Sequence, residues 1–139
     1  LEVTEWGELD YQLVDLPPGT SDAPLTVMQT LPIDGFVVVS TPQELAKLDA
    51  KRCINMIRKL NLNVLGVVEN YTGEVFGQGA GKILAGEVDA PFLGSLALRA
   101  AYRDNSQPTA LADPAVGEEY AQVVEEVRKS LREFGREGA

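Results

Sequence analysis

A short apolar run that ends at two consecutive prolines constrains this chain more than any other feature. The run spans Tyr11 to Leu16 and reads Tyr-Gln-Leu-Val-Asp-Leu, the kind of segment that a buried strand needs. Pro17-Pro18-Gly19 follows and cannot continue a central strand, because proline has no N–H to donate and glycine admits backbone angles closed to other residues. We therefore expect Asp15 near the carboxyl end of a strand, where open α/β sheets bind ligands.

The residues after this turn predict a helix over Ala23 to Leu31. Ser21 or Asp22 can cap it, since a hydroxyl or carboxylate accepts hydrogen bonds from the free N–H groups of a first helical turn. On spacing alone, a strand, a tight turn and a capped helix without any ligand is the simpler interpretation of this stretch.

A second strand is predicted over Phe36 to Thr41. This run is apolar and β-branched without alternation, which is typical of a parallel strand buried on both faces. Thr41 precedes Pro42 and stands three residues before Glu44, so the pattern predicts a capping box with Pro42 at the first helical position. We expect the helix that follows to end at Asn61-Leu62-Asn63.

Two more strands are predicted over Val64 to Glu69 and Pro91 to Leu96, with a short helix over Ile83 to Val88 between them. A last helix opens at Pro114, and its polar face mixes acidic with basic residues. Because helices that lie on membranes carry a basic polar face, we expect this one to dock against the sheet. The alternation of four strands with helices on both faces predicts an α/β protein with a parallel sheet.

Composition excludes several classes of function. The chain has 139 residues and a formal net charge of −9, which disfavours nonspecific binding to nucleic acid because that affinity comes from clustered Lys and Arg. Its one cysteine, Cys53, cannot form an internal disulfide, and no apolar run approaches the roughly 18 to 20 residues of a membrane span. No signal peptide is readable at Leu1. We expect a cytoplasmic protein that binds neither nucleic acid nor membrane.

Four blocks of residues carry a family resemblance over about Trp6 to Pro114. They are Asp15-Leu16-Pro17-Pro18-Gly19-Thr20-Ser21-Asp22; Thr41-Pro42-Gln43-Glu44 with Leu48-Asp49; Asn55-Met56 with Val64 to Asn70; and Pro91-Phe92-Leu93-Gly94. The first block resembles the Walker B and switch II segment of the Mrp/ApbC proteins, in which glycine usually stands at the place of Ser21. These proteins are P-loop ATPases of the ParA/MinD class, and many act as iron–sulfur cluster carriers or scaffolds.

The resemblance implies a three-layer fragment of the ParA/MinD-like P-loop fold, with residues 1–139 as a single domain that forms the C-terminal part of a nucleotide-binding domain. It implies that Asp15 holds Mg²⁺ through water and that Gly19 to Asp22 sense the γ-phosphate of ATP. Pro17 and Pro18 would lie beside the nucleotide. Asn70 would face the adenine, since an amide offers a donor and an acceptor to the purine edge; the alternative for Asn70 is a turn-forming residue.

Two parts of the family pattern are missing. The nearest match to a phosphate loop runs from Gly77 to Lys82, but three residues rather than four separate Gly77 from Gly81, and Ile83 stands where Ser or Thr should follow the lysine. We expect this stretch to be a flexible approach to the helix that starts near Gly81. The Cys-x-x-Cys of the cluster-carrying members is also absent and Cys53 lies within a predicted helix, so a bridging iron–sulfur cluster is unsupported by the residues.

Two hypotheses follow for function. The first is the C-terminal part of a Mrp-like ATP-binding protein, an ATPase only when the part with the phosphate-loop lysine is supplied. It would act as a homodimer, with iron–sulfur client or assembly proteins as partners. The second is a non-catalytic dimerising module that keeps the fold without turnover. Without a first strand and its phosphate loop, the sheet should expose an apolar edge, so we expect the chain to pair with itself or with a missing half.

Overall fold

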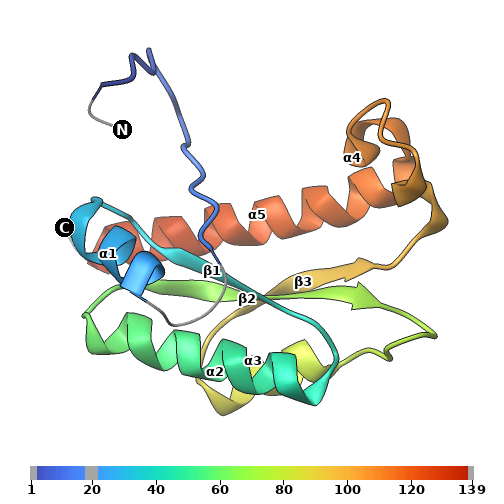
Figure 1. The fold of residues 1–139 in the computed structure, drawn as a ribbon, viewed down its shortest axis with the longest axis horizontal. Helices are drawn as coiled ribbons and strands as arrows, with labels where there is room; N and C mark the ends of the chain where they lie inside the picture. Colours follow the sequence, from blue (N-terminus) through green and yellow to red (C-terminus); the bar gives the residue numbers. More distant parts are fainter. Residues whose placement is uncertain (1–2, 18–21, 138–139) are drawn as a thin grey trace.

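The computed structural model describes residues 3–17 and 22–137, which form a parallel sheet with helices packed on it (Figure 1). The sheet has the strand order β1-β2-β3, with strands β1 (Phe36–Ser40), β2 (Val64–Thr72) and β3 (Phe92–Ala97). The helices are α1 (Asp22–Thr30), α2 (Glu44–Lys59), α3 (Ala80–Glu87), the 3₁₀ helix η1 (Ala100–Arg103), α4 (Thr109–Ala112) and α5 (Pro114–Glu137).

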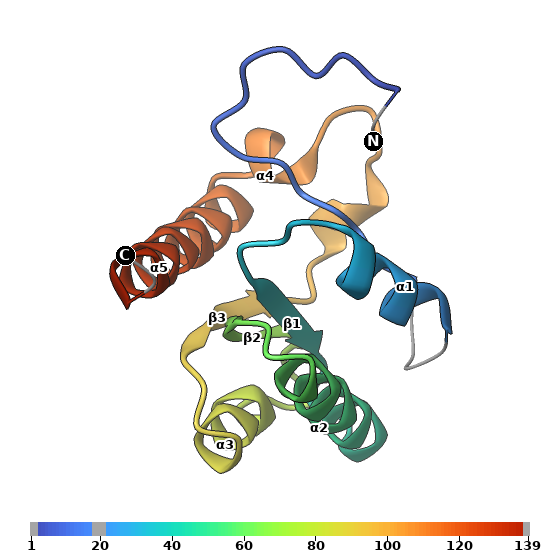
Figure 2. The same cartoon turned by 90° about the vertical axis from the view of Figure 1, so that its left-hand side faces the viewer.

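Helices cover both faces of the sheet and give the molecule three layers (Figure 2). Helices α2 and α3 pack on one face, whereas α5 packs on the other face against β3 and β2. The α/β three-layer class predicted from the sequence is therefore confirmed, and so is the docking of the last helix on the sheet. Within the described ranges, no helix is both long and apolar enough to cross a membrane.

The main core lies between the sheet and the layer formed by α2 and α3. Its buried members are Met28, Phe36, Val38, Ala50, Ile54, Ile57, Val64, Val67, Leu84, Ala85 and Val88. A smaller cluster of Val68, Leu93 and Leu96 lies under α5, where Val123 and Val127 pack against it. Most of the apolar burial therefore holds α2 and α3 to the sheet.

The strand expected at Tyr11 to Leu16 does not form. Residues 11–17 are extended chain outside the sheet, and Leu13 is 94% exposed. A strand needs a neighbour for its backbone N–H and C=O groups, and among the described residues β1 pairs only with β2. The apolar pattern of this segment is that of a strand, but no described neighbour completes it.

The prediction that β1 is buried on both faces is also wrong. Phe36, Val38 and Ser40 are buried, whereas Val37 is 39% and Val39 58% exposed. The physical reason is the placement of α5, which packs over β3 and β2 and leaves the two valines open to solvent. One face of β1 is thus covered by α2, and the opposite face is not.

The capping box at Thr41 is a further wrong prediction. Gln43 has extended backbone angles (φ −74°, ψ 139°), so α2 begins at Glu44 rather than at Pro42, and its cap residue makes no side-chain capping bond in the described structure. The Thr41 hydroxyl instead donates to Oε1 of Gln43 at 3.4 Å. An extended residue between Thr41 and the helix keeps the hydroxyl from the first-turn N–H groups.

The different burial of two isoleucines predicts different losses of stability when each is replaced with alanine. Ile54 is fully buried in the main core, whereas Ile83 lies exposed on α3. Replacing Ile54 with Ala should lower the free energy of unfolding by about 2–5 kcal/mol, because a cavity remains. The control Ile83→Ala should change it by less than about 0.5 kcal/mol. Urea unfolding followed by circular dichroism measures both, and equal effects would show that α2 is not packed as described.

Candidate functional site

The carboxyl ends of the three strands meet at one edge of the sheet. Ser40 of β1 lies beside Glu69 of β2, and Thr72 at the end of β2 lies beside Ala97 of β3. The connections toward α2, α3 and η1 all leave from this edge. In parallel α/β proteins it is the edge where ligands bind.

A buried carboxylate organises this edge. The side chain of Glu69 has 0% exposure, and its Oε1 accepts a hydrogen bond from the Gly79 N–H at 2.9 Å. Its Oε2 accepts from the Gly81 N–H in the first turn of α3. The two bonds tie β2 to the N-terminus of α3, where a helix favours negative charge. The signal for Glu69 in the sequence is an acidic residue that directly follows the apolar run Val64 to Val68.

Hydrogen bonds connect the glycine-rich stretch after β2 to itself and to Glu69. Gly73 and Gly77 exchange two backbone hydrogen bonds, of 3.0 and 2.7 Å, which close a tight loop. Gly79 then adopts a left-handed conformation (φ 99°) as the N-cap of α3. Because the N–H groups of Gly79 and Gly81 already bind Glu69, they are not available to a phosphate group. The flexibility expected for this stretch stays a prediction, whereas its failure as a phosphate loop has a structural cause.

Asn70 lies within β2, where it pairs with Leu96 of β3 beside a shift in the strand register. Its Oδ1 accepts from the N–H of Tyr71 at 2.9 Å, and Tyr71 itself has a left-handed backbone (φ 59°). Asn70 is therefore a strand residue whose side chain bonds the next backbone N–H, and not the turn-forming residue of the alternative interpretation. Recognition of a base by its amide group stays a prediction.

The structure places the other predicted site residues along the N-terminal segment. Asp15 and Pro17 lie on exposed extended chain, so Asp15 does not stand at the end of a strand as expected. The neighbouring Leu16 packs against the main core. Asp22 is the exposed first residue of α1. Pro18 and Gly19 lie outside the described residues.

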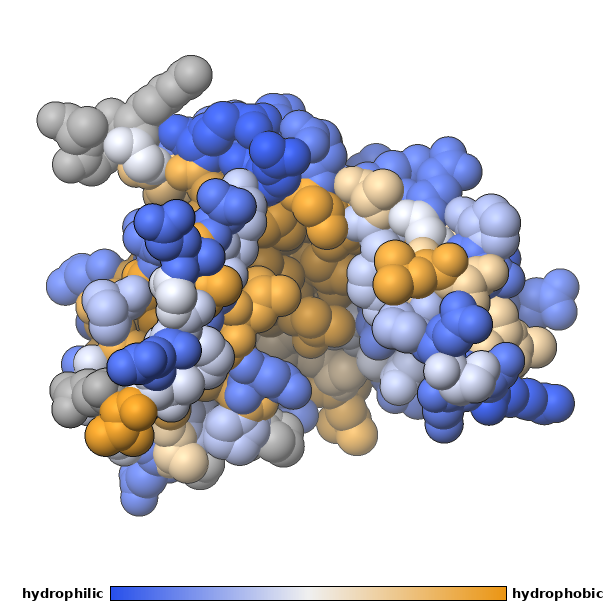
Figure 3. Space-filling view, turned by 90° about the horizontal axis from the view of Figure 1, so that it is seen from above, coloured by the Kyte–Doolittle hydropathy of each residue, from blue (hydrophilic) through white to orange (hydrophobic). Residues whose placement is uncertain are grey.

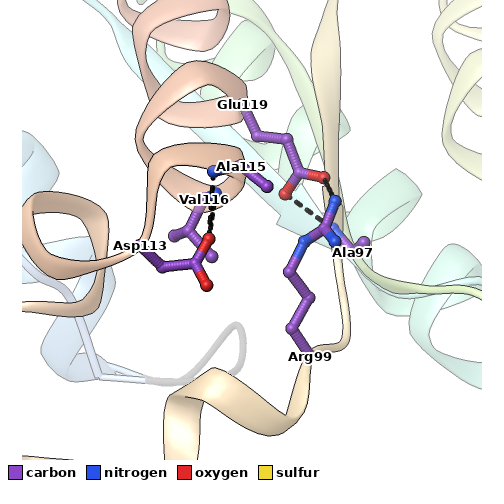
Figure 4. A network of polar contacts seen from close by, with 6 residues as sticks. All are labelled: Ala97, Arg99, Asp113, Ala115, Val116 and Glu119. Carbon is purple, nitrogen blue, oxygen red and sulfur yellow. Dashed lines mark hydrogen bonds and ion pairs between the residues drawn. The ribbon is translucent and has the colours of Figure 1, made fainter.

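A second polar group fastens α5 to the end of β3 (Figure 4). Glu119 accepts hydrogen bonds from the Ala97 N–H, at 3.2 Å, and from the guanidinium of Arg99. The hydrogen bond to Glu119 raises the pKa of Arg99. Asp113 caps α5, since its Oδ1 accepts from the N–H groups of Ala115 and Val116 at 3.0 and 3.1 Å. The sequence did not predict the pairing of Arg99 with Glu119, because these two residues are twenty positions apart.

Residues 1–132 of the chain match the ParA family, described as "NUBPL iron-transfer P-loop NTPase". The chain belongs to this family. The predicted resemblance to ParA/MinD-type proteins is thereby confirmed.

Relatives of this ParA-family chain include three proteins named for iron–sulfur clusters. The iron–sulfur cluster carrier protein of Pseudomonas fragi is 45% identical over 80% of the chain and 43% of the relative. That of Methanocaldococcus jannaschii is 40% identical over 88% of the chain and 47% of the relative. The iron–sulfur cluster transfer protein NUBPL of Mus musculus is 37% identical over 95% and 46%. The chain thus spans about half the length of the curated relatives it matches.

Two solved structures share the fold. The cell division ATPase MinD of Pyrococcus furiosus has a TM-score of 0.73 at 20% identity, over 86% of this chain and 52% of that one. A nucleotide-binding protein from Archaeoglobus fulgidus, in complex with ADP, has a TM-score of 0.62 at 39% identity, over 83% and 49%. The first likeness shows the P-loop NTPase fold alone, and the second joins fold with sequence.

The donor atoms of this ParA-family chain do not fit an iron–sulfur cluster. The chain has one cysteine and no histidine. Cys53 is half-buried in α2 against the main core, and burial raises the pKa of its thiol. In the part of the chain that the structure describes, no three His, Cys, Asp or Glu side chains gather as a metal site. Cluster ligation needs several thiolates, and this chain offers one thiol that resists ionisation.

The Glu69 contacts predict that two glycines of α3 respond oppositely to alanine. A Cβ on Gly81 would lie 2.7 Å from Cβ and 2.8 Å from Oε2 of Glu69, whereas one on Gly86 would meet open space. We expect Gly81→Ala to destabilise the fold by about 1–3 kcal/mol through overpacking. Gly86→Ala should stabilise it by up to about 1 kcal/mol, because alanine favours the helix. Urea midpoints test this, and a Gly81→Ala protein as stable as the Gly86→Ala protein would contradict the contact.

The burial of Cys53 predicts a shifted titration of its thiol. Since burial raises the folded pKa above the unfolded one, the thiol contributes stability at low pH that is lost as pH rises through the folded pKa. The rate of iodoacetamide alkylation, measured against pH, should have a higher midpoint in the native protein than in urea. N-acetylcysteine under the same two conditions controls for the solvent. Coinciding protein midpoints would contradict the packing of Cys53 against the core.

Proposed function

We propose that this chain forms the C-terminal, base-facing part of an ATP-binding protein that carries iron–sulfur clusters. The observation that carries the proposal is the ParA-family match over residues 1–132. Two further facts support it: close relatives are named iron–sulfur cluster carrier proteins, and the A. fulgidus protein, 39% identical, was solved with ADP. The likeness of the fold to MinD supports the P-loop framework.

Within this proposal, the N-terminal segment serves the metal and the γ-phosphate. Mg²⁺ takes few protein carboxylates and keeps several waters, which suits the exposed carboxylate of Asp15 on extended chain. Gly19 and Asp22 would sense the γ-phosphate, and Pro17 and Pro18 would lie beside the nucleotide. When bound, Mg·ATP supplies the phosphoryl group, and these residues hold and orient it.

Asn70 is the residue that we assign to the base. Its Oδ1 is held by the Tyr71 N–H, which fixes the plane of the amide and leaves the NH₂ group as the donor for a purine acceptor. The position at the carboxyl edge of a parallel sheet suits a ligand contact. A fixed amide discriminates between bases because a mismatched base leaves its donor unpaired.

The phosphates have to be bound by other parts of the complete protein. The N–H groups of Gly79 and Gly81 bind a buried carboxylate, and the same stretch lacks the Ser or Thr of a phosphate loop. Catalysis of phosphoryl transfer consists largely of positioning and of charge neutralisation by a lysine and Mg²⁺. ATP hydrolysis is thus proposed for the complete protein and not for these 139 residues.

Iron–sulfur clusters are, in this proposal, cargo whose ligands come mainly from elsewhere. The single half-buried thiol of Cys53 cannot hold a cluster, so further thiolates would come from other segments or from client and assembly proteins. A homodimer stays a prediction. No particular observation favours the alternative of a non-catalytic dimerising module.

The proposal is tested by ATP turnover and ATP affinity. The purified chain with Mg·ATP should show no turnover. When the half of the P. fragi carrier that this chain does not match is fused to it, ATP binding and slow hydrolysis should appear. In that fusion Asn70→Ala should weaken ATP binding about tenfold, the effect of one lost hydrogen bond of about 1.4 kcal/mol.

The control variant is Asn55→Ala, which removes an exposed asparagine of α2 and should leave ATP affinity unchanged. Turnover by the purified chain alone would contradict the division of roles. Equal ATP affinity of the Asn70→Ala and Asn55→Ala fusions would remove Asn70 from the base site.

A further inference from the structure

Helix α2 is basic, although the protein as a whole has a net charge of −9. Five of the twelve lysine and arginine residues of the chain lie within the sixteen residues of this helix, and they are Lys47, Lys51, Arg52, Arg58 and Lys59. The same helix carries two carboxylates, Glu44 and Asp49. The positive charge of the molecule is therefore concentrated on one element.

Three of these cations bind groups within the chain. Lys47 and Lys51 pair with Glu87 of α3, at 3.0 and 3.6 Å. The guanidinium of Arg58 donates to two backbone carbonyl groups directly after α3. These contacts fasten α2 to the neighbouring helix, so their role is structural. Two cations of α2 take no part in them.

The two remaining cations border a hollow on the solvent side of α2. Arg52, Asn55, Met56 and Lys59 line it, and its volume is about 350 Å³. The Arg52 side chain is 65% exposed and lies 3.6 Å from Asp49 of the same helix, a surface pair that contributes little. The ammonium group of Lys59 has no partner among residues 3–17 and 22–137. Both charges are thus available to a ligand.

The spacing of these residues describes what the hollow can bind. Arg52 and Lys59 are seven positions apart, so they lie on one face of the helix, about 10.5 Å apart along its axis. Met56 lies between them and also packs against the main core. A fitting ligand has two anionic groups with an apolar group between them. In an extended peptide the side chains of residues i, i+2 and i+4 share a face and span about 13 Å, which two long, flexible cationic side chains can match.

We propose that the surface formed by Arg52, Asn55, Met56 and Lys59 binds an acidic segment of a partner protein. Two carboxylates of the segment pair with Arg52 and Lys59, and an apolar side chain between them packs on Met56, whose flexible thioether adapts to its contact. The charge of the whole molecule supports this occupant. An acidic partner is repelled by most of an anionic surface and is steered toward a basic one.

Three other occupants fit this surface less well. Nucleic acid needs many clustered cations, and only two of α2 are unengaged among the described residues. A helix that lies on a membrane inserts its apolar face, whereas Ala50, Ile54 and Ile57 of α2 are buried in the main core. A two-fold pair of chains would bring identical patches together and so place cations against cations.

The surface is separate from the proposed nucleotide site. Helix α2 begins at the carboxyl edge of the sheet and ends before the first residue of β2, so Lys59 lies toward the opposite edge. Apolar residues gather in a hollow on the α5 side, which Figure 3 shows from above, whereas α2 packs on the other face of the sheet. The proposal therefore does not rest on Asn70 or on ATP.

The experiment titrates the isotope-labelled chain with the peptide Ser-Glu-Ser-Leu-Ser-Glu-Ser and follows the backbone amide signals by two-dimensional NMR. Both peptide ends are blocked to remove their charges, and no nucleotide is added. In about 10 mM salt, where the Debye length is about 30 Å, the signals of residues 52–59 should shift with a dissociation constant of about 1 mM or below. The same peptide with glutamine in place of both glutamates should bind at least about tenfold more weakly, because the ion pairs are lost.

Matched double variants locate the contact. Arg52→Glu combined with Lys59→Glu should weaken peptide binding at least about tenfold, because both attractions become repulsions. Arg128→Glu combined with Lys129→Glu is the control and should bind as the unmodified chain does. It changes the net charge equally and also removes an arginine that lies near a carboxylate three residues earlier, at 3.8 Å.

Three results would overturn the proposal. The first is the absence of shifts at residues 52–59 in the unmodified chain, and the second is equal weakening by the two double variants, which would show a general effect of charge. The third is an oligothymidylate that binds these residues as tightly as the acidic peptide does. The glutamine peptide tests the charge requirement without altering the protein, so the comparison stands even if a double variant fails to fold.

Discussion

The buried carboxylate of Glu69 is the interaction on which the carboxyl edge of the sheet depends. A charge removed from water is tolerated only when it is paired and hydrogen-bonded, and here both oxygens accept from N–H groups of Gly79 and Gly81. The contact fixes where α3 begins and so directs Leu84 and Ala85 into the main core. Gly81 has to lack a side chain because the carboxylate occupies the space that a Cβ would need.

The same interaction prevents this edge from acting as a phosphate-binding loop. Phosphate loops work because several backbone N–H groups converge on an anion. In this chain the carboxylate of Glu69 is the anion that these N–H groups bind, and a second anion beside it would be repelled. The strand ends can still present Asn70 and hold α5 through Glu119 and Arg99. The proposed function therefore divides base recognition and phosphate binding between different parts of the family fold.

Sequence patterns correctly predicted the elements whose apolar residues are buried by other parts of this chain. β2, β3 and α5 appear near their expected positions, since their apolar residues meet partners in these 139 residues. The predictions for Tyr11 to Leu16 and for the second face of β1 were wrong for the opposite reason. Their apolar residues indicate burial against a neighbouring element, and the described residues contain no such element. The capping box at Thr41 failed because one extended residue, Gln43, shifts the helix start. The contacts of Glu69 and Glu119 join residues ten or more positions apart, so no local pattern identifies their partners.

The cysteine content constrains how the family's cluster chemistry could involve this chain. Relatives are named for carrying iron–sulfur clusters, yet the one thiol here faces a core whose low polarity disfavours the thiolate. Ionising the half-buried Cys53 would place a charge beside the apolar side chains of this core. Helix α2 carries Ala50, Ile54 and Ile57 into the main core, which fixes the position of Cys53 on the same helix against the sheet layer. The packing of α2 therefore holds Cys53 against the core and disfavours the thiolate that a cluster ligand requires.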